Sequence, residues 1–459
     1  MARYDIVILG GGPGGYIAAI KASQLGAKVA VVEKDRLGGV CLNWGCIPTK
    51  TMLVTAKQYK DVLRAEEFGI KGVDVSKVSV DWNMLLQRKD TVVNRLVSGI
   101  EMLFKKNKID FYSGMGTVIN KNQIEVNGEV IDFDKLIIAT GASSKYVDIP
   151  GLDEAIKSGK AMDNYGVLQL EDIPKEIVMV GANVYAIEFA TLFSAIGSNV
   201  TIIHNQKQIL PFIENELAKT LERQLKKDGV KIISDANFKE IREQEIVVDH
   251  KGKEKTFSGD KYMLFLGTKA NLAGLESLNL KLSPRGFIET NDKMETSVEG
   301  VYAIGDVIGK YPLAHVASAE GIVAAENIMG ISSSLNYNLV PTVVYSFPEL
   351  ASVGISEETA KEQGLDYKVS KFPLSANGMA IANGETVGFV KIISDNQYGE
   401  IIGVHIMASH ASDMISKAVA LMQIEGTVYD LAKTIHPHPT FAEAMVEAAY
   451  GSIDKPIHI

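Results

Sequence analysis

The sequence predicts an α/β fold with two doubly wound domains of parallel sheet, followed by a smaller α+β domain. Residues 4–34 read as a short apolar strand, a glycine-rich turn, a helix and a second apolar strand. Residues 176–205 repeat that order about 170 residues later. Alternating strands and helices of this kind favour parallel sheets covered by helices. From about residue 340 the pattern changes to alternating strands followed by helices, which predicts a separate α+β domain.

The segments between these units are also predictable in part. Residues 81–106 have apolar side chains at helical spacing, and short strands are expected at 114–119, 123–126 and 135–141. Residues 262–271 and 300–307 both read as strands that run into glycine turns. No low-complexity linker interrupts the chain, so we expect the domains to pack closely.

Size and charge exclude several classes of function. The chain has 459 residues and a net charge of −9, which disfavours nucleic acid or an anionic membrane as a partner. It contains no run of 18 or more apolar residues, so no membrane span is expected. The segment MARYDIVILGGG enters a strand at once and lacks the form of a signal peptide, which predicts a cytoplasmic protein.

The first glycine turn has the features of a dinucleotide site. Gly10 permits a tight turn, Gly12 lets the backbone approach a pyrophosphate, and Gly15 permits close packing of helix on strand. The helix that follows presents free N–H groups and a positive dipole to the phosphates. Glu33 ends the second strand, where a carboxylate binds ribose hydroxyls. We therefore predict a Rossmann-like dinucleotide-binding domain rather than a glycine turn used only for packing.

Cys41 and Cys46 are the only cysteines of the chain. Residues five apart in a regular helix rise by about 7.5 Å, whereas a disulfide needs Cα atoms within about 7 Å. If the two cysteines pair, the helix must be distorted between them, and Gly45 and Pro48 permit this. Two buried unpaired thiols are the alternative, and no neighbouring side chains complete a metal site.

The stretch GGVCLNWGCIPTK resembles the active-site signature of the flavoprotein disulfide reductases, and within them that of the dihydrolipoamide dehydrogenases. Further similar motifs are IIATGA at 137–142, GVYAIGDV at 300–307, LAHVASAEG at 313–321 and HPHPTFAE at 436–443. Glutathione and mercuric reductases are weaker resemblances because no further cysteine pair is present. The resemblance covers essentially the whole chain.

The resemblance implies roles for four residues around the dithiol. Cys46 is expected to lie against the flavin as the charge-transfer thiol, and Cys41 is expected to exchange with the substrate dithiol. Lys50 is expected near flavin N5, paired with Glu188. The chemistry needs a base to form the attacking thiolate, and the flavin turns a two-electron thiol couple into hydride transfer.

The resemblance also implies that FAD binds at the first turn and Glu33, with Asp306 at its ribityl and pyrophosphate region. The residues expected to bind the flavin cofactor are Gly10, Gly12, Pro13, Gly14, Gly15, Glu33, Lys34, Gly39, Val40, Lys50, Gly116, Thr140, Gly141, Asp306, Leu313, Ala314 and His315. Those expected on the nicotinamide side, for NAD or NADP, are Gly181, Tyr185, Glu188, His204 and Gly267. No metal ligands are expected.

The acid/base implied by the resemblance is His438, oriented by Glu443. Imidazole titrates near neutral pH, and a carboxylate fixes its tautomer and raises its basicity. His436 is the alternative base, and we prefer His438 because the family pattern places the base directly before Pro-Thr. In the family this histidine reaches the disulfide of the other subunit, so the resemblance implies an obligate homodimer.

Four domains follow from the resemblance. We expect an FAD-binding domain at 1–146, an NAD(P)-binding domain at 147–268, a central domain completing the FAD site at 269–339, and an interface or dimerisation domain at 340–459.

The second glycine turn departs from the family pattern. Asn183 stands where a glycine is expected, which puts a side chain where backbone normally approaches a pyrophosphate. Tyr185 replaces a smaller aliphatic residue. His204 and Asn205 stand where an acid normally selects NAD, and no arginine cluster suited to NADP replaces it.

Smaller departures are Thr268 where arginine is usual and Val316 where lysine is common, and Lys207 is the only nearby cation.

Three hypotheses for the function fit this sequence. The first is a dihydrolipoamide dehydrogenase with an altered site for NAD or NADP, serving lipoyl domains of a 2-oxo-acid dehydrogenase or glycine-cleavage complex. The second is the same dithiol–flavin chemistry with a ferredoxin, flavodoxin or quinone. The third is a slow component that mainly binds such a complex. We favour the first.

Overall fold

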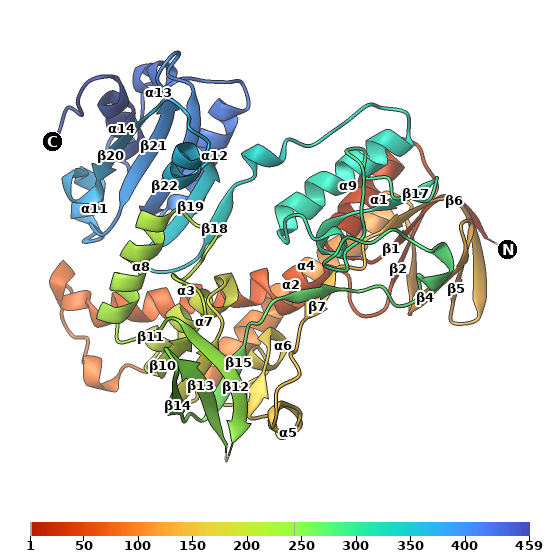
Figure 1. The fold of residues 1–459 in the computed structure, drawn as a ribbon, viewed down its shortest axis with the longest axis horizontal. Coiled ribbons are helices and arrows are strands. Elements are labelled where there is room, and N and C mark those ends of the chain that lie inside the picture. The colour runs from red at the N-terminus through yellow and green to blue at the C-terminus, as the bar shows by residue number, and fades with distance from the viewer. Residues whose placement is uncertain (1, 243) are drawn as a thin grey trace.

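The computed structural model describes residues 2–242 and 244–459, and its main elements form three sheets of five or more strands (Figure 1). The first sheet has the order β3-β2-β1-β6-β5-β4, and β17 pairs with β6. The pairs β1–β2, β2–β3, β1–β6 and β6–β17 are parallel, whereas β4, β5 and β6 form an antiparallel meander. Its strands are β1 (Arg3–Leu9), β2 (Val29–Glu33), β3 (Asp110–Ser113), β4 (Gly116–Asn120), β5 (Gln123–Val126), β6 (Glu129–Ile138) and β17 (Val301–Ala303).

Helices α1 (Pro13–Gln24) and α9 (Ala314–Ile328) pack tightly against each other on this sheet. A Cβ atom on Gly321 of α9 would lie 2.5 Å from the carbonyl oxygen of Gly14, so glycine allows the two backbones to approach. The predicted strand–turn–helix–strand unit is therefore present, and its strands are buried in the core of the first domain.

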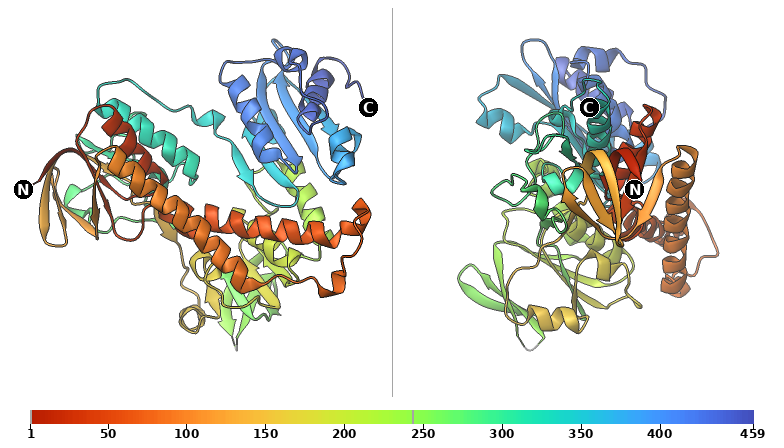
Figure 2. Two further views of the ribbon diagram at one scale, coloured as in Figure 1. Left: turned by 180° about the vertical axis from the view of Figure 1, so that it is seen from behind. Right: turned by 90° about the vertical axis from the view of Figure 1, so that its right-hand side faces the viewer.

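Three further helices connect this domain to the rest of the chain: α2 (Gly39–Trp44), α3 (Cys46–Leu63) and α4 (Trp82–Lys106). The helix predicted at 81–106 is confirmed, and Asp81 caps it by accepting a hydrogen bond from the Met84 N–H at 3.0 Å. Figure 2 shows α3 and α4 as two long helices that cross the molecule.

The second sheet has the order β11-β10-β9-β15-β8, and all its neighbouring strands are parallel. Its strands are β8 (Ala161–Met162), β9 (Glu176–Val180), β10 (Asn199–Ile203), β11 (Lys231–Ile233) and β15 (Lys261–Leu264). Helix α7 (Val184–Ala195) is buried along most of its length, and α8 (Asn215–Lys227) buries one apolar face. An antiparallel sheet of β12 (Ala236–Arg242), β13 (Glu245–His250) and β14 (Lys253–Phe257) is inserted before β15. The second unit of the predicted doubly wound fold is thus present.

The C-terminal part is an α+β domain, as predicted. Its antiparallel sheet has the order β18-β19-β22-β21-β20. The strands are β18 (Thr342–Val344), β19 (Glu349–Gly354), β20 (Tyr367–Pro373), β21 (Phe389–Asp395) and β22 (Ile401–Ala408). The helices are α10 (Glu357–Glu362), α11 (Gly378–Ala382), α12 (Ala411–Met422), α13 (Val428–Lys433) and α14 (Glu443–Ile453).

A two-stranded antiparallel ribbon joins the first two domains, formed by β7 (Ala142–Ser144) and β16 (Thr268–Ala270). The predicted boundaries near residues 146 and 268 fall at or beside this ribbon. β17 from the predicted central segment pairs with β6 of the first sheet. Two short helices, α5 (Leu152–Lys157) and α6 (Asn164–Val167), follow the ribbon. The exact domain limits stay predictions.

Candidate active site

The first glycine turn is built so that only glycine fits at two positions. Gly10 has a φ of +111°, and a Cβ atom there would overlap the carbonyl oxygen of Ala139. A Cβ atom on Gly15 would overlap the carbonyl oxygen of Gly10. Gly12 is the N-cap of α1 and offers no side chain to the helix end. The first N–H groups of α1 therefore remain free for an anion.

Glu33 is held at the end of β2 by the backbone of the same turn. Its carboxylate accepts hydrogen bonds from the Gly11 N–H at 2.7 Å and the Asp35 N–H at 2.9 Å. These bonds fix the carboxylate beside the turn, where the dinucleotide fold presents it to a ribose.

A cavity of about 190 Å³ runs from this turn to the two cysteines. Fourteen of the predicted site residues line it: Gly12, Pro13, Gly14, Glu33, Lys34, Gly39, Val40, Cys41, Cys46, Thr140, Gly141, Tyr185, Asp306 and Ala314. These residues come from five separate parts of the sequence, at 12–14, 33–46, 140–141, 185 and 306–314, and the fold brings them to one surface.

Other residues predicted for the flavin site lie behind or beside that surface. Gly116 is buried in β4, where a Cβ atom would meet the side chains of Leu9 and Ile124. Leu313 is the N-cap of α9 and makes no side-chain cap. The His315 Nε2 lies 2.9 Å from the carbonyl oxygen of Pro341.

Asp306 carries its carboxyl group into the cavity from a short 3-10 turn, and burial raises its pKa to about 6. Glu320 holds this turn in place, because its carboxylate accepts hydrogen bonds from the Gly305 N–H and the Tyr337 hydroxyl, each at 2.6 Å. Burial raises the pKa of Glu320 as well. Glu320 was not among the residues predicted for the site, although it lies inside the LAHVASAEG motif.

Asn271 is a second residue that sequence reasoning missed. It lines the cavity, donates from Nδ2 to the carbonyl oxygen of Thr140 at 3.0 Å and accepts from the Ser143 hydroxyl at 2.7 Å. It thereby ties β16 to the loop after β6. No local pattern marks a contact between residues 131 positions apart in the chain.

The dithiol lies at a break between two helices. α2 ends at Trp44, Gly45 adopts φ −148° and ψ −103°, and α3 begins at Cys46. The helix is therefore distorted between the two cysteines, as their pairing would require. Pro48 does not interrupt the helix, because it lies in the first turn of α3, where proline is tolerated. Both cysteines are free thiols.

The two thiols differ in acidity. A hydrogen bond from the Cys41 thiol and the charge of the Lys50 ammonium outweigh the burial of Cys46 and lower the pKa of Cys46. The same hydrogen bond, together with burial, raises the pKa of Cys41.

Lys50 and Glu188 form the ion pair expected from the sequence. The Lys50 Nζ lies 2.8 and 2.7 Å from the two carboxylate oxygens of Glu188, and one of these oxygens also accepts from the Tyr345 N–H at 3.1 Å. The ammonium lies 4.6 Å from the centre of the Tyr345 ring. Burial opposes the charge of Lys50, but Glu188 outweighs it and the pKa of Lys50 is raised.

His438 and Glu443 are in contact on the C-terminal domain. The His438 Nδ1 lies 2.8 Å from Glu443, whose other oxygen accepts from the Thr440 N–H at 2.7 Å. Burial opposes ionisation of Glu443, but these two bonds outweigh it and lower its pKa. The other ring nitrogen of His438, Nε2, is then available, and the side chain is 79% exposed.

The structure does not bring His438 to the dithiol cavity of its own chain. α14, which begins at Glu443, lies in the C-terminal domain away from α2 (Figure 1). His436, the alternative base, has Nδ1 bonded to the carbonyl oxygen of Thr434 at 2.7 Å and Nε2 buried. Burial lowers the pKa of His436, which disfavours its protonated form.

The second glycine turn repeats the backbone of the first but not its open helix end. Gly181 has a φ of +118°, and a Cβ atom there would overlap the carbonyl oxygen of Phe265. Asn183 is the N-cap of α7, and its Oδ1 accepts from the Ala186 N–H at 3.2 Å. The amide side chain therefore covers the helix end that a pyrophosphate occupies at such turns.

Tyr185, predicted for the nicotinamide side, borders the same cavity as the two cysteines. Its ring stacks on Phe265 with centroids 6.2 Å apart and an interplanar angle of 12°. Burial is the main cause that raises the pKa of its hydroxyl. Tyr185 thus forms a wall between the second turn and the dithiol.

His204 is turned into the protein at the end of β10. Its side chain lies with Nε2 3.2 Å from the Ser234 hydroxyl, and the residue is 3% exposed. Burial lowers its pKa. Asn205 and Lys207 are exposed beside it, and Gly267 lies in an open turn with a φ of +105°. His204 in this position is not directed outward, as a residue that selects a ribose must be.

Comparison with known proteins agrees with this geometry. Residues 4–321 match the family model described as pyridine nucleotide-disulphide oxidoreductase, and residues 340–449 match the dimerisation domain of the same family. A dihydrolipoyl dehydrogenase of Bacillus subtilis (strain 168) is 41% identical, with 99% of each chain covered. One from Geobacillus stearothermophilus is 39% identical, with 99% of this chain and 97% of that protein covered.

Solved structures show the same likeness. LpdA from Mycobacterium tuberculosis has a TM-score of 0.88 at 25% identity, covering 98% of this chain and 99% of that one. The Cu(II) complex of the HOCl-induced flavoprotein disulfide reductase RclA from Escherichia coli has a TM-score of 0.87 at 26% identity, with the same coverage.

The fold and the site together define an oxidoreductase that couples a cysteine pair to a dinucleotide cofactor. The chain belongs to the pyridine nucleotide-disulphide oxidoreductase family. Its full-length relatives include dihydrolipoyl dehydrogenases, which supports dithiol–flavin redox chemistry, and the matched dimerisation domain supports a homodimer. Within the described part of the chain, no helix is both long and apolar enough to cross a membrane.

Family membership implies binding of FAD and NAD(P). The first turn fits FAD, because the N-terminus of α1 is uncapped and a Cβ atom on Gly12 would meet only the Gly39 Cα, at 3.7 Å. The second turn fits NAD(P) less well, because the Asn183 side chain must leave the Ala186 N–H first. An N-cap bond is worth about 1 kcal/mol, which corresponds to roughly fivefold in affinity for a ligand that must displace it.

Proposed function

We propose that the protein oxidises dihydrolipoamide to lipoamide through Cys41 and Cys46 and passes the electrons, with FAD, to NAD or NADP. The observation that carries this proposal is the dithiol at the break between α2 and α3, which borders the cavity of the first turn. The substrates would be lipoyl groups on the domains of a 2-oxo-acid dehydrogenase or glycine-cleavage complex. The full-length likeness to dihydrolipoyl dehydrogenases supports this substrate class.

Cys41 is proposed to exchange with the substrate and Cys46 to lie against the flavin. The lower pKa of Cys46 supports this division, because a thiolate is the stable form next to the Lys50 ammonium. Oxidation of one dihydrolipoamide releases two electrons and two protons as its two thiols become a disulfide. FAD, when bound, supplies the two-electron carrier between thiols and nucleotide.

His438 is proposed as the acid/base, acting on the dithiol of the partner subunit in a homodimer. Its exposed ring and its bond to Glu443 support this role, because Glu443 holds Nδ1 and leaves Nε2 to exchange protons with solvent-facing groups. Removal of a proton from a substrate thiol yields the thiolate that attacks the disulfide.

FAD is proposed to lie along the first turn, with Glu33 at its adenosine ribose and Asp306 at its ribityl and pyrophosphate region. The free N–H groups at the start of α1 support a seat for the pyrophosphate. Lys50, paired with Glu188, is proposed to lie near the reactive ring of the flavin. The position of Lys50 four residues after Cys46 on α3 supports this assignment.

A second candidate function keeps the dithiol chemistry and replaces NAD(P) by another electron acceptor, such as a ferredoxin, flavodoxin or quinone. Two observations favour keeping this candidate: Asn183 caps α7, and His204 is buried against Ser234. We rank it below NAD(P), because the cap is worth only about 1 kcal/mol.

Anaerobic reduction tests both candidates. The yellow holoprotein is reduced with dihydrolipoamide, its flavin spectrum is followed, and NAD or NADP is then added separately. Reoxidation by either nucleotide supports the first candidate and names the cofactor. Full reduction without reoxidation by either nucleotide rejects the first candidate and supports the second. Absence of reduction by dihydrolipoamide contradicts both.

A further inference from the structure

The end of α2 leaves one backbone group that the helix cannot satisfy. In a continuous helix the carbonyl oxygen of Trp44 would accept a hydrogen bond from the N–H of residue 48. Residue 48 is a proline, which has no N–H, and the helix breaks at Gly45 before reaching it. The Trp44 carbonyl therefore needs a donor from elsewhere in the protein, because an unpaired carbonyl in the interior is costly.

Asn164 of the second domain supplies this donor. Its Nδ2 lies 2.7 Å from the carbonyl oxygen of Trp44, across 120 positions of the sequence. Asn164 is the first residue of α6 and is 7% exposed. The side chain of Asp163 caps α6 by accepting hydrogen bonds from the N–H groups of Tyr165 and Gly166, at 3.1 and 3.5 Å. The donor is thus carried by a capped turn and reaches the helix break in a fixed orientation.

The next residue of α6 contacts the Trp44 side chain. The Tyr165 ring packs on the Trp44 ring with centroids 5.4 Å apart and an interplanar angle of 31°. Such pairs of aromatic rings attract each other beyond the effect of the area that they bury. The indole N–H of Trp44 donates to Asp35 at 3.2 Å on the other side. Two consecutive residues of α6 therefore hold both the backbone and the side chain of Trp44.

The position of Trp44 determines where α3 begins, because only Gly45 separates it from Cys46. Cys41 is the third residue of α2, and Cys46 is the first residue of α3. A rotation of the Trp44 peptide changes the path of the backbone between the two cysteines, and glycine restricts such a rotation least. The separation of the two thiols thus depends on contacts from outside α2 and α3.

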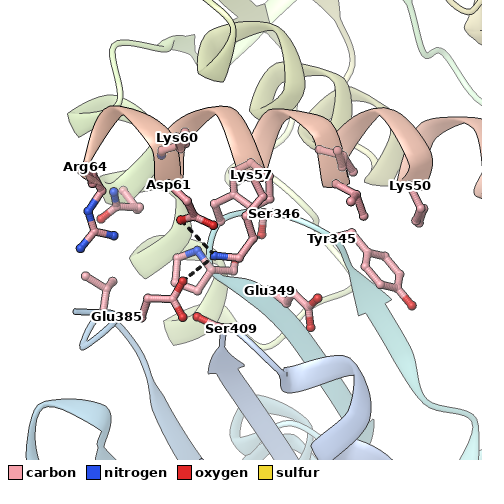
Figure 3. Close-up of a pocket in the computed structure, with 16 residues that line it drawn as sticks. Lys50, Lys57, Lys60, Asp61, Arg64, Tyr345, Ser346, Glu349, Glu385 and Ser409 are labelled. Atoms are coloured by element: carbon pink, nitrogen blue, oxygen red, sulfur yellow. Dashed lines mark hydrogen bonds and ion pairs between the residues drawn. The ribbon is translucent and has the colours of Figure 1, made fainter. Parts of the chain in front are cut away.

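A second contact connects α3 to the same domain. Lys50 of α3 pairs with Glu188 of α7 at 2.7 Å. Figure 3 shows Lys50 projecting from α3 toward Tyr345, whose ring centre lies 4.6 Å from the ammonium. The bond from Asn164 to Trp44 lies before the helix break, and the pair of Lys50 and Glu188 lies after it. The second domain therefore holds the chain on both sides of the dithiol.

We propose that Asn164 and Tyr165 are positioning residues that stabilise the Cys41–Cys46 disulfide relative to the two thiols. A disulfide requires Cα atoms within about 7 Å, whereas two thiols tolerate a wide range of separations. Contacts that hold the break in one geometry therefore cost the reduced form more conformational freedom than the disulfide form. The proposal rests on the dithiol chemistry of the proposed function and assigns the second domain a part in its redox equilibrium.

The test is the thiol–disulfide equilibrium of the FAD-loaded protein against mixtures of reduced and oxidised dithiothreitol. Reduced dithiothreitol loses two electrons and two protons as its ring disulfide forms. The Cys41–Cys46 disulfide takes them up as its S–S bond breaks and two thiols form. Samples are equilibrated anaerobically, quenched with acid and alkylated after denaturation, and the alkylated fraction of both cysteines is measured by mass spectrometry. This measurement reports the equilibrium without any turnover.

The matched variants are Asn164→Leu and Asn327→Leu. Each removes an amide that donates to a backbone carbonyl, that of Trp44 in the first case and that of Ser333, at 2.7 Å beyond the end of α9, in the second. We expect Asn164→Leu to lower the equilibrium constant for disulfide formation by roughly fivefold, the effect of about one hydrogen bond, which equals about 20 mV. Asn327→Leu is expected to leave the constant unchanged. No shift in Asn164→Leu, or an equal shift in both variants, would overturn the proposal.

A second pair of variants tests the proposal if Asn164→Leu does not fold. Tyr165→Leu removes the ring that packs on Trp44 and is expected to shift the equilibrium in the same direction. Tyr165→Phe keeps the ring and is expected to match the wild type. Equal equilibrium constants for these two variants would contradict the proposal.

Failure of this inference is distinguishable from failure of the proposed function. If the wild-type protein forms no Cys41–Cys46 disulfide at any ratio of oxidised to reduced dithiothreitol, the dithiol chemistry of the proposed function fails together with this inference. If the wild type forms the disulfide and Asn164→Leu has the same equilibrium constant, only this inference fails.

Discussion

Lys50 links the Glu188 ion pair to the dithiol. It forms the ion pair with Glu188, and after the hydrogen bond from Cys41 its charge contributes to lowering the pKa of Cys46. A nearby positive charge favours the thiolate, and partial burial reduces solvent screening of that effect. Replacing this one ammonium should therefore be visible in the acidity of Cys46.

We predict that Lys50→Met raises the pH at which Cys46 ionises. In the reduced wild-type protein the lowered pKa means that the thiolate is already present below the ordinary thiol value of about 8.5 and is lost only at still lower pH. The rate of Cys46 alkylation by iodoacetamide, followed against pH by peptide mapping, should have its midpoint moved upward in the variant. Lys57→Met, on the same helix and paired with Glu385, is the control. An unmoved midpoint in Lys50→Met would show that Lys50 does not act on Cys46.

The different roles proposed for Cys41 and Cys46 give a second prediction. Cys46→Ser should abolish the long-wavelength charge-transfer band of the two-electron-reduced protein, because the thiolate donor is gone. Cys41→Ser is the comparison and should retain a band, since Cys46 is still next to Lys50. The measurement is the absorption spectrum after anaerobic reduction. A band of normal strength in Cys46→Ser would reverse the two assignments.

The two glycine turns show how one side chain changes what a helix terminus can bind. α1 and α7 both begin after an extended residue, with φ −70° at Gly12 and φ −83° at Asn183. Their backbones differ little, yet α1 is open and α7 is capped. The two turns therefore differ in whether a side chain already occupies the N–H groups at the start of the helix. Exchanging Gly12 and Asn183 should exchange the ability of the two turns to bind a pyrophosphate.

We predict that Asn183→Gly strengthens NADH binding by roughly fivefold while lowering stability by only a few tenths of a kcal/mol, because glycine is itself a tolerated N-cap. Adding His204→Glu should bring no further gain, because the side chain at this position is buried against Ser234 and does not face the turn. Binding is measured by equilibrium dialysis of NADH against the FAD-loaded protein. Unchanged affinity in both variants would mean that the second turn is not where the nucleotide binds.

The reverse exchange serves as its counterpart. Gly12→Asn should leave the protein folded, since a Cβ atom there meets only Gly39 and the φ of −70° suits any residue. It should lower the FAD content of the purified protein, because the amide would cap α1 as Asn183 caps α7. Flavin content per protein chain is the measurement. Normal content would contradict the comparison of the two turns.

Prediction from sequence succeeded where a signal is local and failed where it is not. The helix at 81–106 and the break at Gly45 follow from spacing and from residue type. Asparagine is a favoured N-cap residue, so the cap made by Asn183 was predictable from the sequence. The glycine pattern predicted only that the Asn183 side chain interferes with a pyrophosphate. The support of Asp306 by Glu320, and of the Thr140 loop by Asn271, depends on tertiary contacts that no local pattern reveals.

A buried ion cluster holds the second domain against the C-terminal domain. Lys391 in β21 lies 2.8 Å from Glu214, the N-cap of α8, and 2.6 Å from Glu357. The side chains of Lys391 and Glu214 are 3% and 1% exposed. Burial opposes the Lys391 charge, but these carboxylates outweigh it and raise its pKa. The cluster fixes the two domains because neither charge is stable in the interior without the other.

We predict that Lys391→Met destabilises the protein by about 3–5 kcal/mol, since it leaves the Glu214 carboxylate buried without its partner. Adding Glu214→Gln should recover part of this loss. Lys371→Met, which removes a half-exposed partner of Glu216 on the neighbouring strand, should cost less than about 1 kcal/mol. The midpoints of urea denaturation are compared across the variants. Equal urea midpoints for Lys391→Met and Lys371→Met would contradict the idea that the buried ion cluster holds the two domains together.

Because His438 lies away from the cysteines of its own chain, mixing differently mutated subunits can test the site by activity alone. If each reactive centre takes its cysteines from one chain and its histidine from another, Cys41→Ser and His438→Gln proteins are each inactive alone but complement each other when their subunits are exchanged. Random reassortment would give about half mixed dimers, each with one intact centre, and hence about a quarter of the wild-type activity. Two defective copies of the gene would then restore function in a cell that carries both.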